Sequence, residues 1–299
     1  MRNEEPLLLH FDDEADEALR LARAVGLRAA PIERHRFPDD ELRLRLPAVL
    51  PERVVLYRSL HRPNEKLLEL LLVARSAGHS GARHLTLVAP YLAYMRQDKA
   101  FRPGEAVSQR IVGEFLAGLF DGVITVDPHL HRIGSLAEAI PVPHAIALPG
   151  AGLLADVAVA HRGRPLLVGP DAESRQWVDA AAQRHELDSV VCTKIRHDDR
   201  RVDIALPEGV DLAGRAVVIL DDVASSGHTL ARTAERLRAA GAASVDVAVT
   251  HALFAGDAIE VIRAAGVDEV WSTDCIAHPS NAVHVAPLLA EALRAILAE

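Results

Sequence analysis

The chain has 299 residues, 49% of them hydrophobic, which is enough for the cores of about two domains. Its net charge is −9 and it has no long basic stretch, so we expect no nucleic-acid binding. It has two cysteines, too short an N-terminal apolar run for a signal peptide, and no run near the roughly 20 apolar residues that cross a bilayer. We therefore expect a cytoplasmic protein that does not enter membranes.

Short apolar runs alternate with helical patterns along the whole chain. The apolar runs predict strands at 7–11, 54–57, 85–89, 123–126, 166–169, 189–193, 217–220, 245–250 and 270–273. Helical patterns fall between them at 13–25, 64–77, 106–119, 174–184, 230–240 and 258–265. This order predicts an α/β protein with two Rossmann-like domains, whose parallel sheets are covered on both faces. The proline-rich stretch 141–149 marks the junction, which gives domains over 1–145 and 146–287.

The stretch 217–230 is the most informative part of the sequence. An apolar run leads directly into Asp221 and Asp222, a loop of small and polar residues follows, and a helical pattern begins at Leu230. Backbone N–H groups at such a helix start can bind a phosphate, and carboxylates can accept hydrogen bonds from a sugar diol. The pattern thus suits a phosphorylated sugar, although an ordinary strand–turn–helix unit has the same spacing.

Polar residues also follow three other predicted strands. Asp127 and His129 follow the run at 123–126, Asp171 follows 166–169, and the segment 91–99 follows 85–89. Ligands bind beyond the carboxyl ends of strands in open α/β sheets, so these positions favour a shared cleft. Each of them taken singly also fits a solvated turn.

Seven motifs, in order from about residue 36 to 293, resemble those of ribose-phosphate pyrophosphokinases, which make phosphoribosyl diphosphate (PRPP). The loop 221–229 is similar to the PRPP loop, D-D-x-x-[DS]-T-G-x-T, which phosphoribosyltransferases share. The other six segments read RFPDDE (36–41), PYLAYMRQDK (90–99), VDPH (126–129), GPD (169–171), KIR (194–196) and VAPLLA (285–290). The resemblance implies two type I phosphoribosyltransferase-like domains, with the C-terminal helix, 288–299, joining the first.

The resemblance implies that ATP and ribose 5-phosphate react to give PRPP and AMP with Mg²⁺. Lys194 and Arg196 would stabilise the developing charge, and 197–201 would form a lid that closes over the phosphates. Without the resemblance, these two cations read as an ordinary strand end. Asp171, Asp221 and Asp222 would hold the ribose hydroxyls or a second magnesium ion. The 5-phosphate would lie on Ser225, Ser226, Gly227, His228 and Thr229.

The ATP site implied by the family lies in the first half of the chain. Arg96, Gln97, Asp98 and His129 would hold ATP, and Asp127, His129 and Asp171 would place magnesium. Phe37, Asp39 and Glu41 resemble a loop that contacts adenine in a neighbouring subunit, which implies a homo-oligomer, a dimer or a multiple of it. From the residues alone, these segments also fit a charged surface loop and a plain turn. We expect no zinc site at His129 and His131.

Three residues depart from the family pattern: Ser226 replaces Thr, a mild change, and His228 and Asp40 differ more. Two other functions share parts of the pattern. His228 replaces a small residue of the phosphate loop, where it could crowd the phosphate or add a donor. Asp40 replaces a glycine, and Asp tolerates a positive φ better than most residues do. A phosphoribosyltransferase would need only the 221–229 loop and would have no ATP to hold. A regulatory subunit without turnover would keep the fold, but intact Lys194 and Arg196 argue against it.

Overall fold

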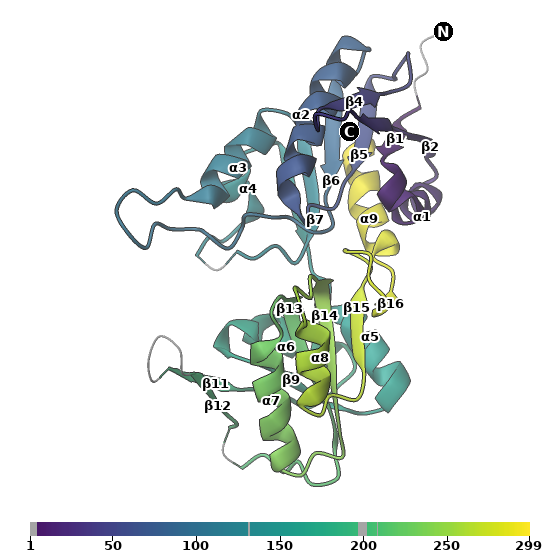
Figure 1. Cartoon of the computed structure of the whole chain (residues 1–299). Helices are drawn as coiled ribbons and strands as arrows, with labels where there is room; N and C mark the ends of the chain where they lie inside the picture. The colour runs from purple at the N-terminus through teal and green to yellow at the C-terminus, as the bar shows by residue number, and fades with distance from the viewer. Residues whose placement is uncertain (1–4, 131, 197–201, 208) are drawn as a thin grey trace. The chain divides into compact units, whose positions relative to one another are not determined.

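A computed structural model describes residues 5–130, 132–196, 202–207 and 209–299. The chain divides into two compact units, and the second lies within the first along the sequence. Unit 1 comprises 1–148 together with 285–299, and unit 2 comprises 149–284. Both units are α/β sandwiches with a central sheet (Figure 1). No helix among these residues has the length and apolar character needed to span a bilayer.

The sheet of unit 1 is parallel throughout and has the strand order β2-β1-β5-β6-β7-β8. Its central strands are apolar and buried on both faces, as expected where helices cover a parallel sheet on each side. The strands are β1 (Leu7–His10), β2 (Arg28–Pro31), β5 (Arg53–Tyr57), β6 (His84–Val88), β7 (Gly122–Val126) and β8 (His144–Leu148).

Helices and one hairpin complete unit 1. The 3-10 turn η1 (Asp12–Glu14) leads into α1 (Ala15–Val25), which contacts the C-terminal helix α9 (Ala286–Leu297). Helix α9 also contacts β7 and β8, so the end of the described chain completes the layer over this sheet. The remaining elements are the antiparallel hairpin of β3 (Glu33–Arg36) and β4 (Leu42–Arg45), and the helices α2 (Pro63–His79), α3 (Ser108–Ala117) and α4 (Leu136–Ala139).

Unit 2 repeats this plan, with the parallel order β10-β9-β13-β14-β15-β16 and a hairpin of β11 and β12. Its strands are β9 (Leu166–Gly169), β10 (Ser189–Val191), β11 (Thr193–Arg196), β12 (Val202–Ala205), β13 (Ala216–Ala224), β14 (Ser244–Ala252), β15 (Val270–Thr273) and β16 (Asn281–Val283). Its helices are α5 (Ala151–Arg162), η2 (Ala172–Ser174), α6 (Arg175–Arg184), α7 (His228–Ala239) and α8 (Ala258–Ala264).

Alternate residues of β13 point to opposite faces of the sheet and build two separate cores. Val217 and Ile219 pack with Leu230 and Leu237 of α7 on one face. Val218 and Leu220 pack on the other face against a group from α5 and α6 that includes Leu154, Ala155, Val178 and Ala181. The period of two is the ordinary consequence of strand geometry. The two-sided burial explains why this strand reads as an uninterrupted apolar run.

The fold class predicted from the sequence is confirmed, and the structure corrects several boundaries. The proline-marked stretch at 141–149 contains β8, so the chain leaves the first sheet only after Leu148. The strand predicted at 189–193 is two strands, β10 and β11, with Cys192 between them. The strand predicted at 217–220 runs on to Ala224, and α7 begins at His228 rather than at Leu230.

Candidate active site

The strongest candidate site in unit 2 lies where its strand order reverses. The chain leaves β9 towards β10 on one side, and β13 pairs with β9 on the other side. Such a switch point is where open α/β sheets bind ligands, beyond the carboxyl ends of the strands. Asp171 follows β9, Asp221 and Asp222 lie near the end of β13, and Lys194 lies on β11.

Asp171 is held by the turn that follows its strand. Its side chain accepts a hydrogen bond of 3.1 Å from the N–H group of Glu173, which caps η2. The ammonium of Lys194 lies 3.9 Å from the other carboxylate oxygen of Asp171. This separation is longer than a hydrogen bond, so Lys194 remains available to an anionic ligand. Burial and the charge of Asp171 also raise the pKa of the nearby Cys192 thiol to about 12, which keeps that thiol protonated.

Asp221 and Asp222 form an acidic pair whose negative charges repel each other. The carboxylate of Asp221 accepts a 3.0 Å hydrogen bond from the N–H group of Asp222. Burial raises the pKa of Asp221 well above its usual value, and the charges of Asp222 and Asp171 add to the rise. Polar hydrogens or a cation from a ligand would stabilise the ionised form of this carboxyl.

The loop after β13 forms a cradle at the start of α7. Gly227 precedes the helix with φ of 74°, and a Cβ there would lie 2.9 Å from the carbonyl oxygen of Ala258. Both the backbone conformation and the space therefore require glycine at this position. Ser226 and His228 are exposed, and Ser225 and Thr229 are half-buried. The free N–H groups of the first turn of α7 lie beside these hydroxyls, an arrangement suited to a phosphate.

The second group of predicted site residues lies in unit 1, in the loop after β6. Arg96 is exposed, and Gln97 accepts a 3.2 Å hydrogen bond from Ser108 at the start of α3. Asp98 accepts two hydrogen bonds, of 2.5 and 2.7 Å, from one nitrogen of Arg132. Asp98 thus holds the guanidinium of Arg132 at this loop, and Arg132 is a residue that sequence reasoning missed. Asp98 and Arg132 are 34 positions apart in the sequence, so no local pattern predicts that they pair.

Asp127 and His129 follow β7, the neighbour of β6 in the same sheet. The N–H group of Val126 donates to the carbonyl oxygen of Pro90 at 3.2 Å, which joins the ends of these two strands. Asp127 has a positive φ of 37°, and its own N–H group donates to Leu148 at 2.9 Å. Asp127 and His129 are half-buried, so the polar ends of β6 and β7 lie at one edge of this sheet.

Phe37, Asp39 and Glu41 occupy the turn of the β3–β4 hairpin. The N–H group of Phe37 donates to the carbonyl oxygen of Glu41 at 2.8 Å, and Asp40 has φ of 74°. The replacement of glycine by aspartate at this turn thus meets the positive φ that the sequence analysis allowed for. The ring of Phe37 is 38% exposed, with the guanidinium of Arg43 5.9 Å from its centre. An exposed aromatic face beside a cation suits stacking with a planar ligand.

Arg196 directly precedes the predicted lid along the chain. The backbone of Arg196 ends β11 and pairs with Val202 of β12. The predicted lid, 197–201, lies outside the described residues. His131, for which no zinc role was expected, lies outside them as well. Among the residues that the structure does describe, no group of three or more His, Cys, Asp or Glu side chains is arranged to hold a metal.

Comparison with known proteins identifies the family. Residues 8–119 match the family model of the N-terminal domain of ribose phosphate pyrophosphokinase, and 144–276 match the phosphoribosyl transferase domain. The ribose-phosphate pyrophosphokinase of Methanopyrus kandleri is 35% identical, with 92% of this chain and 94% of that protein aligned. Ribose-phosphate pyrophosphokinase 1 of Archaeoglobus fulgidus is 36% identical, with 92% and 95% aligned.

The chain belongs to the ribose-phosphate pyrophosphokinase family.

The fold agrees with this assignment. The crystal structure of phosphoribosylpyrophosphate synthetase from Mycobacterium smegmatis matches with a TM-score of 0.82, covering 98% of this chain and 99% of that one at 22% identity. The transferase model matches within the second half of the chain, and the pyrophosphokinase model matches the first half. The chain is therefore an enzyme of PRPP synthesis, as the ordered motifs predicted, and not a phosphoribosyltransferase that consumes PRPP.

Proposed function

We propose that the chain transfers the diphosphoryl group of ATP to ribose 5-phosphate in a magnesium-dependent reaction. The 1-hydroxyl oxygen of the ribose attacks the β-phosphorus of ATP, and its proton passes to solvent. The bond between the β-phosphorus and the oxygen that bridges it to the α-phosphorus breaks, and AMP leaves. Such a transfer depends on alignment and on positive charge near the reacting phosphate, with little covalent participation by the protein.

The switch point of unit 2 is the observation that carries this proposal. It combines a helix-start cradle at 225–229, an acidic pair at Asp221 and Asp222, and the ammonium of Lys194 beside Asp171. A phosphorylated pentose has the matching groups: the 5-phosphate for the cradle and the ring hydroxyls for the carboxylates. Lys194 and Arg196 would then approach the diphosphoryl group and stabilise charge that develops in the transition state.

The ATP-binding residues would come from unit 1. Arg96 offers an exposed planar cation suited to a polyphosphate, and Arg132, which follows β7, is a second cation, held by Asp98. Gln97 and His129 would add hydrogen bonds to the nucleotide. Phe37, Asp39 and Glu41 would contact the adenine. By the family resemblance, that contact is made in a neighbouring subunit, so the active form would be a homo-oligomer.

The residue types carried over for magnesium suit this ion. Asp127 in unit 1 and Asp171 in unit 2 each offer carboxylate oxygens, which Mg²⁺ prefers, and His129 is carried over from the family motif. A magnesium ion takes one or two protein groups and completes its shell with water and substrate phosphates. When bound it would neutralise charge on the diphosphoryl group. Burial is the main cause of the raised pKa of Asp221, and a cation near Asp171 would offset the further rise that comes from the neighbouring carboxylate charges.

The test is product analysis of the purified protein with ATP, ribose 5-phosphate and Mg²⁺. Equal amounts of AMP and PRPP, absent when Mg²⁺ is chelated, are the expected result. ADP in place of AMP would mean transfer of one phosphoryl group and would overturn the proposal. ATP binding without turnover would favour a regulatory subunit. A screen of other sugar phosphates would then show whether His228 changes the substrate.

A further inference from the structure

The two units have equivalent switch points. In unit 1 the order reverses between β1 and β5, as it does between β9 and β13 in unit 2. Leu9 pairs with Leu56 in the first sheet, and Val168 pairs with Ile219 in the second. Counting from these pairs places Asp12 at the position of Asp171, and Arg58 at that of Asp221. Arg34 is the second residue of β3, as Lys194 is of β11.

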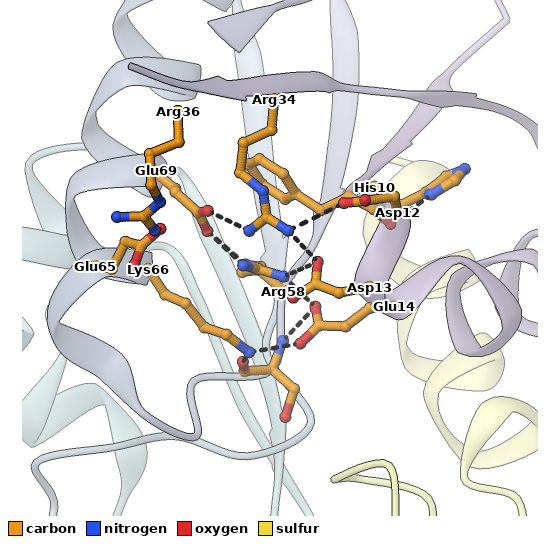
Figure 2. A network of polar contacts seen from close by, with 12 residues as sticks. His10, Asp12, Asp13, Glu14, Arg34, Arg36, Arg58, Glu65, Lys66 and Glu69 are labelled. Atoms are coloured by element: carbon orange, nitrogen blue, oxygen red, sulfur yellow. Dashed lines mark hydrogen bonds and ion pairs between the residues drawn. The ribbon is translucent and has the colours of Figure 1, made fainter. Parts of the chain in front are cut away.

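Charged side chains of unit 1 occupy its switch point and pair with one another (Figure 2). Arg58 is 1% exposed and donates from two nitrogens to one oxygen of Glu69, at 2.8 and 2.5 Å. Its third nitrogen donates to Asp13 at 2.8 Å. The other oxygen of Glu69 accepts a 2.7 Å hydrogen bond from Arg34. Both guanidinium groups lie over the ring of Phe11, at 4.4 and 5.4 Å from its centre.

A second buried pair closes the lower side of this network. Lys66 of α2 donates to Glu14 at 2.8 Å and to the carbonyl oxygen of Ser59 at 2.6 Å. The other oxygen of Glu14 accepts from the N–H group of Ser59 at 3.1 Å. Carboxylates thus surround the cations of this switch point, and the position that carries Asp221 in unit 2 carries a guanidinium here. The charged side chains at this switch point make hydrogen bonds and ion pairs with one another.

Arg34 and Lys194, at equivalent positions in the two hairpins, differ in their contacts. In unit 2, Lys194 lies 3.9 Å from Asp171, beyond hydrogen-bonding distance. In unit 1, Arg34 makes short bonds to Glu69 of α2 and, at 3.0 Å, to Asp12 of η1. Arg36 on the same strand also pairs with Glu65 of α2. These three contacts join β3 to α2 and η1, so the β3–β4 hairpin is fastened to the rest of unit 1.

We propose that the Arg34–Glu69–Arg58 chain is a latch that positions the β3–β4 hairpin for nucleotide binding. Arg34 holds the hairpin, Glu69 joins it to α2, and the buried Arg58 fixes the orientation of Glu69. These three are positioning residues, because they act through Phe37, Asp39 and Glu41 in the turn. The inference rests on the proposed function, in which that turn contacts the adenine of ATP.

The test compares Arg34→Met with Arg45→Met in the full-length enzyme. Arg45 is the matched control, because it lies on the same hairpin and pairs with Glu33 at the exposed surface. Amide hydrogen exchange over 33–45 measures the hold on the hairpin. Steady-state kinetics measure KM for ATP, KM for ribose 5-phosphate and kcat. Arg34→Lys, which keeps the charge but not the forked geometry, serves if Arg34→Met fails to fold.

We expect Arg34→Met to speed exchange over 33–45 and to raise KM for ATP by about tenfold, with kcat and KM for ribose 5-phosphate within about twofold of wild type. Arg45→Met should match wild type in every measurement. Unchanged exchange in Arg34→Met would overturn the latch. Faster exchange with an unchanged KM for ATP would overturn the positioning role. If the wild-type enzyme makes no PRPP, the proposed function fails, whereas the exchange data still test the latch.

Discussion

Lys194 is the residue on which the proposed chemistry depends most directly. Its ammonium lies 3.9 Å from Asp171, and its side chain is 30% exposed, so an incoming anion can compete for it. A cation at this place stabilises the transition state more than the ground state if negative charge accumulates on the diphosphoryl group during transfer. The expected signature of its loss is therefore kinetic.

We predict that Lys194→Ala lowers kcat by about 10²–10³ with a smaller effect on KM for ribose 5-phosphate. The matched control is Arg164→Ala, because Arg164 is an exposed cation just before the start of β9. Its guanidinium donates to the carbonyl oxygen of Glu186. Thermal melting of both variants separates a catalytic defect from unfolding. A wild-type kcat in Lys194→Ala would remove this residue from the mechanism.

Single residues were predictable from the sequence where local geometry constrains them. The turn sequence at 37–40 allowed for a positive φ at Asp40, and Asp40 has φ of 74°. Contacts between distant residues were not predictable. The Asp98–Arg132 pair and the latch residue Arg58 depend on side chains that the sheet order brings together, and one sequence carries no signal of that order.

At the scale of elements, burial decided what could be predicted. The central strands are apolar on both faces, so the sequence marks each of them as an unbroken apolar run. The edge strands β2, β8, β10 and β16 are short and partly exposed, and three of the four were missed. The hairpins were also missed, because their strands are rich in charged residues and read as loops. These exposed elements carry residues of the candidate site.

Helix α9 offers the clearest test of packing. Leu293 is fully buried, and α9 packs on α1, β7 and β8. We predict that Leu293→Ala destabilises unit 1 by about 2–5 kcal/mol, because the lost side chain leaves a cavity that the surrounding helices and strands fill only in part. Urea denaturation measures the change. Glu291→Ala, an exposed position on the same helix, should leave the midpoint nearly unchanged.

At the scale of the whole molecule, the proposed contribution of the hairpin to a neighbouring subunit makes a distinctive prediction. A subunit with Lys194→Ala keeps an intact β3–β4 hairpin, and one with Phe37→Ala keeps the switch point of unit 2 intact. If each site combines a switch point and a hairpin from different subunits, a mixed dimer contains one site with both parts intact.

Mixing the two variants under conditions of subunit exchange should therefore give more activity than either variant has alone. Random pairing predicts about a quarter of the wild-type rate, since half of the dimers are mixed and each has one intact site. Activity at limiting ATP, with each variant alone as the control, provides the readout. No recovery despite verified exchange would mean that the hairpin acts within its own subunit.

The return of α9 to unit 1 has a consequence for the order in which the protein is made. Residues 149–284 leave the ribosome before α9 does, and they hold every strand and helix of the second sheet sandwich. Unit 1 begins first along the chain but needs α9 to cover β7 and β8, whereas all of unit 2 has been translated once residue 284 is added. The domain translated first is therefore the last to receive all of its elements, the reverse of the usual order along a chain.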